Sequence, residues 1–114
     1  FDPSRTKREA AAIAEQRAAG LEARAATDQV RLEVAMAYRR AVSARERHTA
    51  ASGGSEEGRE AFRVVQERRK AGMATLTDEL ETETAALGAA LQEIGAASEV
   101  AIADAALRRA AGEI

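Results

Sequence analysis

Small and apolar residues recur at alternating spacings of four and three between residues 30 and 65, as they do in a helix that packs along one seam. From Pro3 to Lys70 the residues are strong helix formers, with Gly20 as a single weak point. Because most seam positions are small, a partner helix can approach more closely than a Leu seam allows. The seam comprises Val30, Val34, Ala37, Ala41, Ala44, His48, Ala51, Ser55, Gly58, Phe62 and Val65.

A second stripe predicts the partner helix. Its members are Leu80, Leu87, Leu91, Ile94, Ser98, Ala101 and Ala105. We therefore expect an all-α fold, a long antiparallel coiled-coil hairpin with helices at about 4–69 and 76–111. The first helix is much the longer, so its part around Ile13 and Leu21 needs another chain, another part of the parent protein or a fold-back. This excess predicts association into a helical bundle or barrel.

The stretch Ser52-Gly53-Gly54-Ser55 interrupts the helical composition of the first arm. Two adjacent glycines cost about 2 kcal/mol relative to alanines inside a helix. Ser55, followed by Glu56 and Glu57, would also suit the start of a new helix. A break and a continuous, softened helix are both consistent with the pattern, and we favour continuity with a possible bend at 53–54.

The stretch KAGMATLTDELE, residues 70–81, predicts a tight turn at 70–76. Gly72 suits the left-handed position that follows a helix, after three basic residues that favour the helix C-terminus. Thr75 can cap the next helix, and Asp78 three residues later completes a capping box. Asp78 and Glu81 then add negative charge near the helix N-terminus. The sequence therefore predicts a helical hairpin whose tip is this turn.

Composition supports an elongated helical structure, because aromatic residues are too scarce for a thick core. Residues 1–70 carry 15 Lys and Arg against 11 Asp and Glu, whereas residues 71–114 carry 2 against 8. If the arms fold back on each other, a basic helix meets an acidic one; the alternative is drift in composition. The chain lacks the basic patches with stacking aromatics that nucleic-acid binding requires. It has no apolar run of membrane-spanning length.

Candidate catalytic or metal chemistry is sparse. There is no Cys, and His48 is the single histidine, which excludes a thiolate or multi-histidine metal site. His48 occupies a seam position, where packing is the expected role. Asp78 and Glu81 share a helix face, as metal ligands or an acid–base pair would, but helix N-termini are acidic for dipole reasons alone. The chain is not expected to be an enzyme or to bind a cofactor.

Four stretches together resemble the TolC-like outer-membrane efflux proteins. The stretch 1–4 resembles the family's junction between a strand and a long helix, and 34–38 its mid-helix Ala-Tyr stretch. The stretch 62–80 resembles the hairpin at the periplasmic tip, and 103–112 the end of the returning helix. The resemblance implies that residues 1–114 are one helical hairpin of a trimeric channel, a fragment of a larger protein and a periplasmic part of the Gram-negative cell envelope.

The resemblance also implies roles for residues of the turn. They dock a periplasmic adaptor (a membrane fusion protein), which links the channel to an inner-membrane pump. The docking residues are then Ala71, Gly72, Met73, Thr75 and Leu76. Asp78 and Glu81 fall at acidic positions of the tunnel entrance, where three protomers would form rings of carboxylates. The alternative is a generic antiparallel coiled-coil scaffold whose turn only reverses the chain; an enzyme or metal site built on Asp78, Glu81 and His48 is a third.

Overall fold

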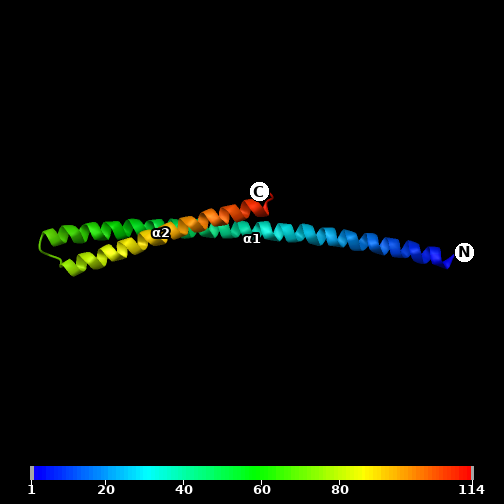
Figure 1. Ribbon diagram of the computed structural model, residues 1–114, viewed down its shortest axis with the longest axis horizontal. Helices are drawn as coiled ribbons and strands as arrows, with labels where there is room; N and C mark the ends of the chain where they lie inside the picture. The colour runs from blue at the N-terminus through cyan, green and yellow to red at the C-terminus, as the bar shows by residue number, and fades with distance from the viewer. Residues whose placement is uncertain (1, 114) are drawn as a thin grey trace. The chain divides into compact units, whose positions relative to one another are not determined.

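The computed structural model describes residues 2–113, so that Phe1 of the junction motif and Ile114 lie outside the described residues. Its elements are α1 (Pro3–Lys70) and α2 (Leu76–Ala110) (Figure 1). No strand occurs in this described part. The predicted all-α hairpin is confirmed, with helix ends within two residues of those expected. The chain consists of two compact units, the first ending at Met36 and the second beginning at Ala37.

The first unit is the N-terminal part of α1. Asp2 caps the start of this helix. Its Oδ1 accepts hydrogen bonds from the backbone N–H groups of Ser4 at 3.0 Å and Arg5 at 3.4 Å. Pro3 follows in the first turn, where its missing N–H needs no partner. The large apolar side chains of this unit, including Ile13 and Leu21, are exposed. Their exposure agrees with the expectation that this part of the helix needs a partner outside the hairpin.

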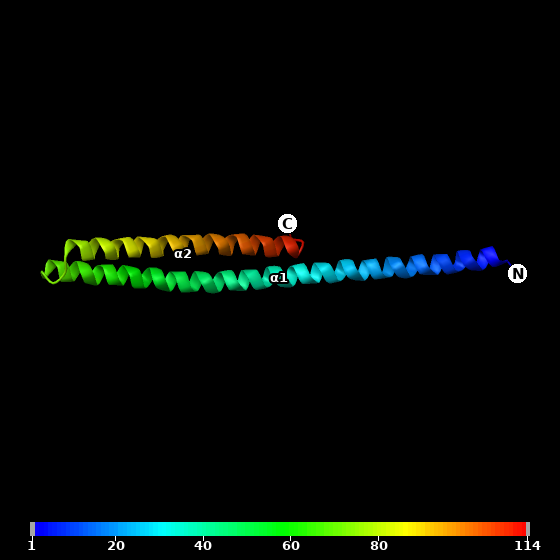
Figure 2. The ribbon, with the colours of Figure 1, turned by 90° about the horizontal axis from the view of Figure 1, so that it is seen from below.

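The second unit is the hairpin, in which α2 runs antiparallel beside α1 (Figures 1 and 2). Its buried apolar residues are all alanines, Ala37, Ala41 and Ala44 on α1 and Ala96 on α2. The other predicted seam positions of α1 in this unit are half-buried, apart from Ser55, which is fully buried. The predicted small-residue seam of α1 is therefore confirmed here. It brings the backbones close together, since a Cβ atom added to Gly58 would lie 3.1 Å from Ala86 Cα.

The seam predicted on α2 is wrong. Leu80, Leu87, Leu91 and Ile94 are between 52% and 69% exposed, and Ser98 and Ala101 are exposed too. The face that packs against α1 carries smaller or polar residues at three–four spacing. It consists of Glu79, Thr82, Ala86, Ala89, Glu93, Ala96, Val100, Ala103, Leu107 and Ala110. The prediction failed because it followed apolar size, whereas most positions on the packed face hold side chains smaller than Leu, which let the two helices approach closely.

Ion pairs between the helices confirm the predicted meeting of a basic and an acidic arm. In each of the four, an arginine of α1 faces an acidic residue of α2. Arg45 pairs with Asp104 at 3.0 Å and Arg47 with Glu99 at 3.3 Å, measured between the nitrogen and oxygen atoms. The arginines of these pairs are exposed, whereas three of the four carboxylates are half-buried, and each pair contributes about 1 kcal/mol or less. Because each pair joins an arginine of α1 to an acidic residue of α2, the pairs together nevertheless favour one antiparallel alignment of α2 along α1.

Helix α1 continues through Ser52–Ser55, and Ser55 does not begin a new helix. A Cβ atom at Gly53 or Gly54 would meet nothing within 4 Å, outside the helix's own nearby backbone. We expect Gly53→Ala/Gly54→Ala to raise the free energy of unfolding by about 2 kcal/mol, because alanine favours the helix. Chemical unfolding of the 114-residue chain measures the gain. Gly58→Ala is the control; it should gain less, since its methyl group presses on Ala86. Equal gains would contradict this account.

Candidate docking tip and acidic positions

The turn between the helices begins with a left-handed glycine. Gly72 has φ 75°, a conformation that side chains with a Cβ atom rarely adopt. Its N–H donates to the carbonyl of Arg69 at 2.9 Å, and the N–H of Met73 donates to the carbonyl of Arg68 at 2.8 Å. This pair of hydrogen bonds is the Schellman arrangement, which satisfies the last carbonyls of α1. The predicted left-handed position of Gly72 after the helix is therefore confirmed.

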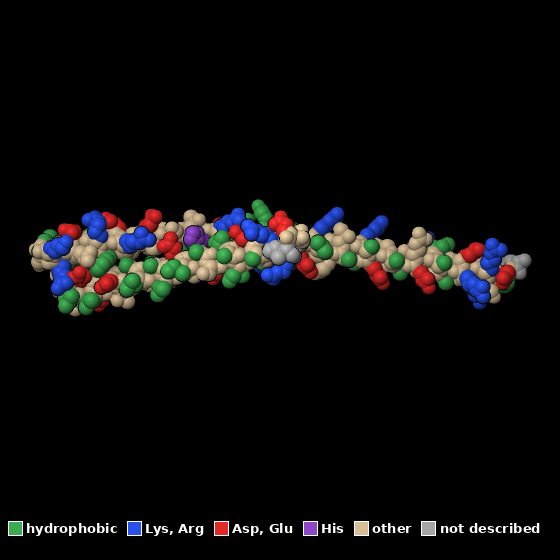
Figure 3. Space-filling view, turned by 45° about the horizontal axis from the view of Figure 1, so that its top comes forward, with side chains coloured by type: hydrophobic (Ala, Val, Ile, Leu, Met, Phe, Trp, Pro, Cys, Tyr) green, Lys and Arg blue, Asp and Glu red, His purple; other side chains and the backbone are tan. Residues whose placement is uncertain are grey.

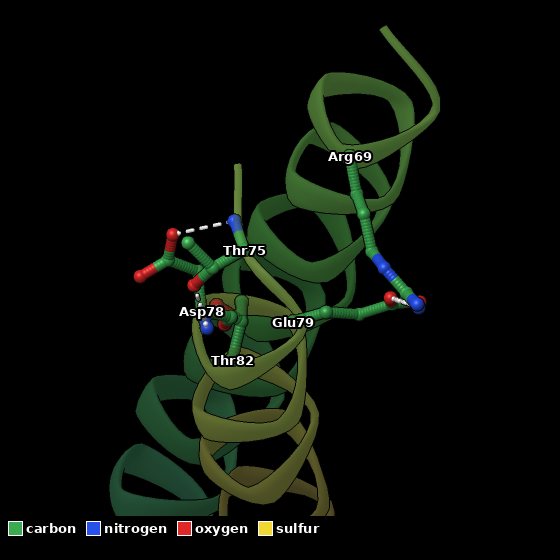
Figure 4. A network of polar contacts seen from close by, with 5 residues as sticks. All are labelled: Arg69, Thr75, Asp78, Glu79 and Thr82. Carbon is green, nitrogen blue, oxygen red and sulfur yellow. Dashed lines mark hydrogen bonds and ion pairs between the residues drawn. The ribbon is translucent and has the colours of Figure 1, made fainter. Parts of the chain in front are cut away.

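A capping box begins α2. Thr75 Oγ1 accepts from the backbone N–H of Asp78 at 3.1 Å, and Asp78 Oδ2 accepts from the backbone N–H of Thr75 at 2.9 Å (Figure 4). Each side chain thus satisfies a backbone donor that the helix leaves free. The tip is therefore closed by hydrogen bonds on both sides of the turn.

The five predicted docking residues all lie at this tip and are all exposed, as their burial along the chain shows. Met73 is 71% exposed, which is the highest value among the large apolar side chains of the described residues. Leu76 follows at 52%. A flexible, polarisable Met at an exposed turn offers an adaptable apolar contact to a partner.

The two predicted acidic positions differ in their surroundings. Both are exposed on the first turns of α2, but the carboxylate of Asp78 is engaged in the capping box. The hydrogen bond from the Thr75 backbone, then that from the Thr75 hydroxyl, and to a smaller extent the charge of Arg68, hold the pKa of Asp78 below its usual 3.8. A structural role for Asp78 is therefore established whatever else it does.

This lowered pKa predicts how stability depends on pH. Since the folded state favours the charged form, the stabilisation from Asp78 is complete above its ordinary pKa and is lost as pH falls through the folded value. Asp78→Ala should therefore lower stability at pH 7 and remove part of the loss that the parent chain shows as the pH falls below the ordinary pKa of 3.8. Urea unfolding at pH 7 and pH 2.5 measures both effects. Glu81→Ala is the control, and an identical pH response in the Asp78→Ala chain would contradict the prediction.

Glu79, one of the acidic residues expected in the first turns of the second helix, also belongs to the tip, in an ion pair that the sequence pattern did not predict. It lies on the inner face of α2, with 17% of its side chain exposed, and pairs with Arg69 of α1 (Figure 4). The pair bridges the two helices at the first contact after the turn. The sequence signal for this pair is a basic residue just before the predicted turn and an acidic residue just after it. The two residues form, with Gln66 and Lys70, the lining of a surface depression.

The stripe of large residues on α2, which the sequence analysis assigned to the seam, lies instead on the outer face of this helix. Large aliphatic side chains point away from α1 along this helix, and all are more than half exposed. Figure 3 shows hydrophobic side chains along the α2 side of the hairpin near the tip, with Lys and Arg along the α1 side. We call this surface the outer face of α2; it consists of Leu80, Leu87, Leu91, Ile94 and Ile102.

The helices, the tight capped turn and the two-faced α2 fit one family. The model of the outer membrane efflux protein family matches residues 2–113. The chain belongs to the outer membrane efflux protein family. This confirms the resemblance to TolC-like channels. No curated protein and no solved structure gives a significant match to the chain.

Membership of the outer membrane efflux family fixes the class of protein. Members are channels rather than enzymes, and they generally form trimers that work with adaptor proteins. Across residues 2–113, no three acidic or histidine side chains gather closely enough to hold a metal ion. Within that same stretch, neither helix is long and apolar enough to cross a membrane.

Proposed function

We propose that this hairpin is a wall segment of a trimeric efflux or type I secretion channel, in the periplasmic part of an outer-membrane protein. It acts as a passive conduit, and its tip docks a periplasmic adaptor that connects it to an inner-membrane pump. The outer face of α2 carries this proposal. Helix α2 already packs against α1 through one face and presents large aliphatic side chains on the opposite face. It is therefore suited to contact a second helix, as in a wall of helices.

The amount of exposed apolar surface supports the same proposal. Each large aliphatic side chain contributes about 1.5–3 kcal/mol when it is fully buried. Five such side chains on one face of a single helix form a strip that soluble monomers rarely leave in water. In the isolated chain the same strip should drive self-association into a helical bundle. A strictly monomeric chain at high concentration in sedimentation would contradict this.

The tip provides the second part of the proposal. Ala71, Gly72 and Met73 present a small, backbone-exposing turn with one adaptable apolar side chain, and Thr75 and Leu76 complete the exposed surface. Such a knob suits docking against a matching helical tip. Because the turn is held by hydrogen bonds on both sides, it needs little ordering when a partner binds.

The docking proposal is tested by crosslinking in cells. Residues 1–114 contain no cysteine, so Met73→Cys introduces the single thiol of this segment. We expect a short thiol-reactive crosslinker to join it to the cognate adaptor under conditions where export operates. Glu99→Cys, placed on α2 away from the tip, is the control and should give no such product. No adaptor product from Met73→Cys in cells that export normally would refute the docking role.

We also propose that Asp78 and Glu81 form carboxylate rings at the tunnel entrance when three protomers assemble. Negative rings favour cations and attract divalent ions. Replacing both residues by Asn and Gln should reduce single-channel cation selectivity and weaken block by divalent ions. Glu113→Gln, just beyond the C-terminal end of α2, is the matched control. Unchanged selectivity and block in the doubly substituted channel would exclude the rings.

A further inference from the structure

Helix α2 offers two faces on which it can pack, and it uses the less apolar one. The outer face carries five large aliphatic residues, whereas half of the ten residues on the inner face are alanines and two, Glu79 and Glu93, are charged. Turning α2 about its axis would bury Leu87, Leu91 and Ile94 and return Glu93 to water. Both changes are favourable by burial and solvation alone. Something specific must therefore hold the inner face against α1.

A polar layer in the middle of the hairpin supplies specific contacts. Ser55 of α1 is completely buried, the only polar residue in this class among those the structure describes. Its Oγ accepts a hydrogen bond from Arg59 Nη2 at 3.3 Å. The same guanidinium lies 3.9 Å from Glu93 Oε2, and 26% of the Glu93 side chain remains exposed. A carboxylate thus enters a seam of alanines at the level of a buried serine.

The environment of Glu93 favours its charged form. Side-chain hydrogen bonding with Ser55, then with Ser52, and next the positive charges of Arg59 and His48, lower the pKa of Glu93 below its usual 4.5. These groups all come from α1. Glu93 is therefore matched by its partners on the opposite helix in this orientation, and it would lose every one of them if α2 turned.

We propose that Ser55 and Arg59 select the face of α2 that packs against α1, and thereby keep the outer face of α2 free for another helix. Arg59 contacts both the buried Ser55 hydroxyl and the Glu93 carboxylate, which makes Glu93 acceptable in the seam. The close approach at Gly58 and Ala86 then adds to the same orientation. This selection concerns the folding of the hairpin itself and does not depend on docking at the tip.

Two pairs of introduced cysteines report which face of α2 meets α1 in the 114-residue chain. Ala44 is buried on α1, and Ala103 lies on the inner face of α2, next to the Arg45–Asp104 ion pair. Ala44→Cys/Ala103→Cys is therefore the inner pair. Ala101 is exposed on the other side of α2, so Ala44→Cys/Ala101→Cys is the outer pair. A disulfide forms only where the two Cα atoms lie within about 7 Å.

The test removes the partners of Glu93. We expect the otherwise unchanged chain to form the inner disulfide almost exclusively. In Ser52→Ala/Ser55→Ala/Arg59→Ala, the ratio of inner to outer disulfide should fall by about tenfold or more, because the half-buried carboxylate of Glu93 loses its partners. Adding Glu93→Ala should restore the inner disulfide, since an alanine then completes the small seam. Arg47→Ala, which removes a different interhelix ion pair, should leave the ratio unchanged.

Three results would overturn the proposal. The first is a triple variant that keeps the original disulfide ratio. The second is a triple variant that forms neither disulfide, since an unpaired Glu93 would then separate the helices instead of turning α2. The third is a failure of Glu93→Ala to restore the inner pair. Restoration by Glu93→Ala also shows that the three α1 substitutions leave the hairpin able to fold.

Discussion

Ala44→Glu is expected to lower the free energy of unfolding of the hairpin by about 4 kcal/mol or more and to separate α2 from α1. Ala44 is 1% exposed, in the seam between the helices. A larger side chain there forces the backbones apart, and its charge would be buried without a partner. While the two helices stay packed, the residues around Ala44 cannot move to make room for the new side chain or let water reach its charge.

Chemical unfolding followed by circular dichroism measures this loss. Ala50→Glu is the matched control, because Ala50 lies on the same helix within two turns and is exposed. The control should stay within about 0.5 kcal/mol of the parent chain, as surface substitutions usually do. Similar stabilities for the two variants would show that the alanine seam is not what holds the hairpin together.

Leu87→Gln/Leu91→Gln/Ile94→Gln is expected to abolish assembly of the channel while the hairpin itself stays folded. The three side chains are between 60% and 69% exposed and do not face α1. Their replacement therefore removes apolar surface that only another helix can cover, of the order of 1.5–3 kcal/mol for each residue in each copy. Over three copies of the protein, this loss of burial free energy is too large for the helices of the channel to stay associated.

Native gel electrophoresis of membrane extracts and export assays in cells test this expectation, with unfolding of the 114-residue chain as the check on the hairpin. Glu46→Gln/Glu56→Gln/Glu57→Gln is the control, since it changes three exposed residues of α1. A triple Leu and Ile variant that assembles and exports normally would contradict the assigned role of the outer face.

Much of the hairpin could be predicted from the sequence because its signals are local. Gly72, Thr75 and Asp78 specify the turn through the backbone hydrogen bonds that each residue type favours. The alternating four–three spacing of small residues identifies the seam of α1. The reversal of charge near residue 70 predicts the arginine-to-carboxylate ion pairs. None of these inferences requires knowledge of distant contacts.

The packed face of α2 could not be obtained in the same way. Leu87, Leu91 and Ile94 have the stronger apolar signal, and a rule that follows apolar size selects them. The choice depends instead on the distance between the helices and on a match between Glu93 and the serines of α1, which are properties of two segments together. The pairing of Arg69 with Glu79 was missed for the same reason.

Protection of Leu91 in the assembled channel tests the account most directly. Leu91→Cys introduces one thiol at the centre of the outer face, where the side chain is 69% exposed in the hairpin alone. A water-soluble maleimide should label this thiol rapidly in the isolated 114-residue chain at low concentration. In the channel assembled in cells, we predict labelling at least about tenfold slower, because packing against another helix excludes the reagent. Equal labelling rates, with full labelling of both samples after denaturation, would contradict the claim that this hairpin forms part of a channel wall.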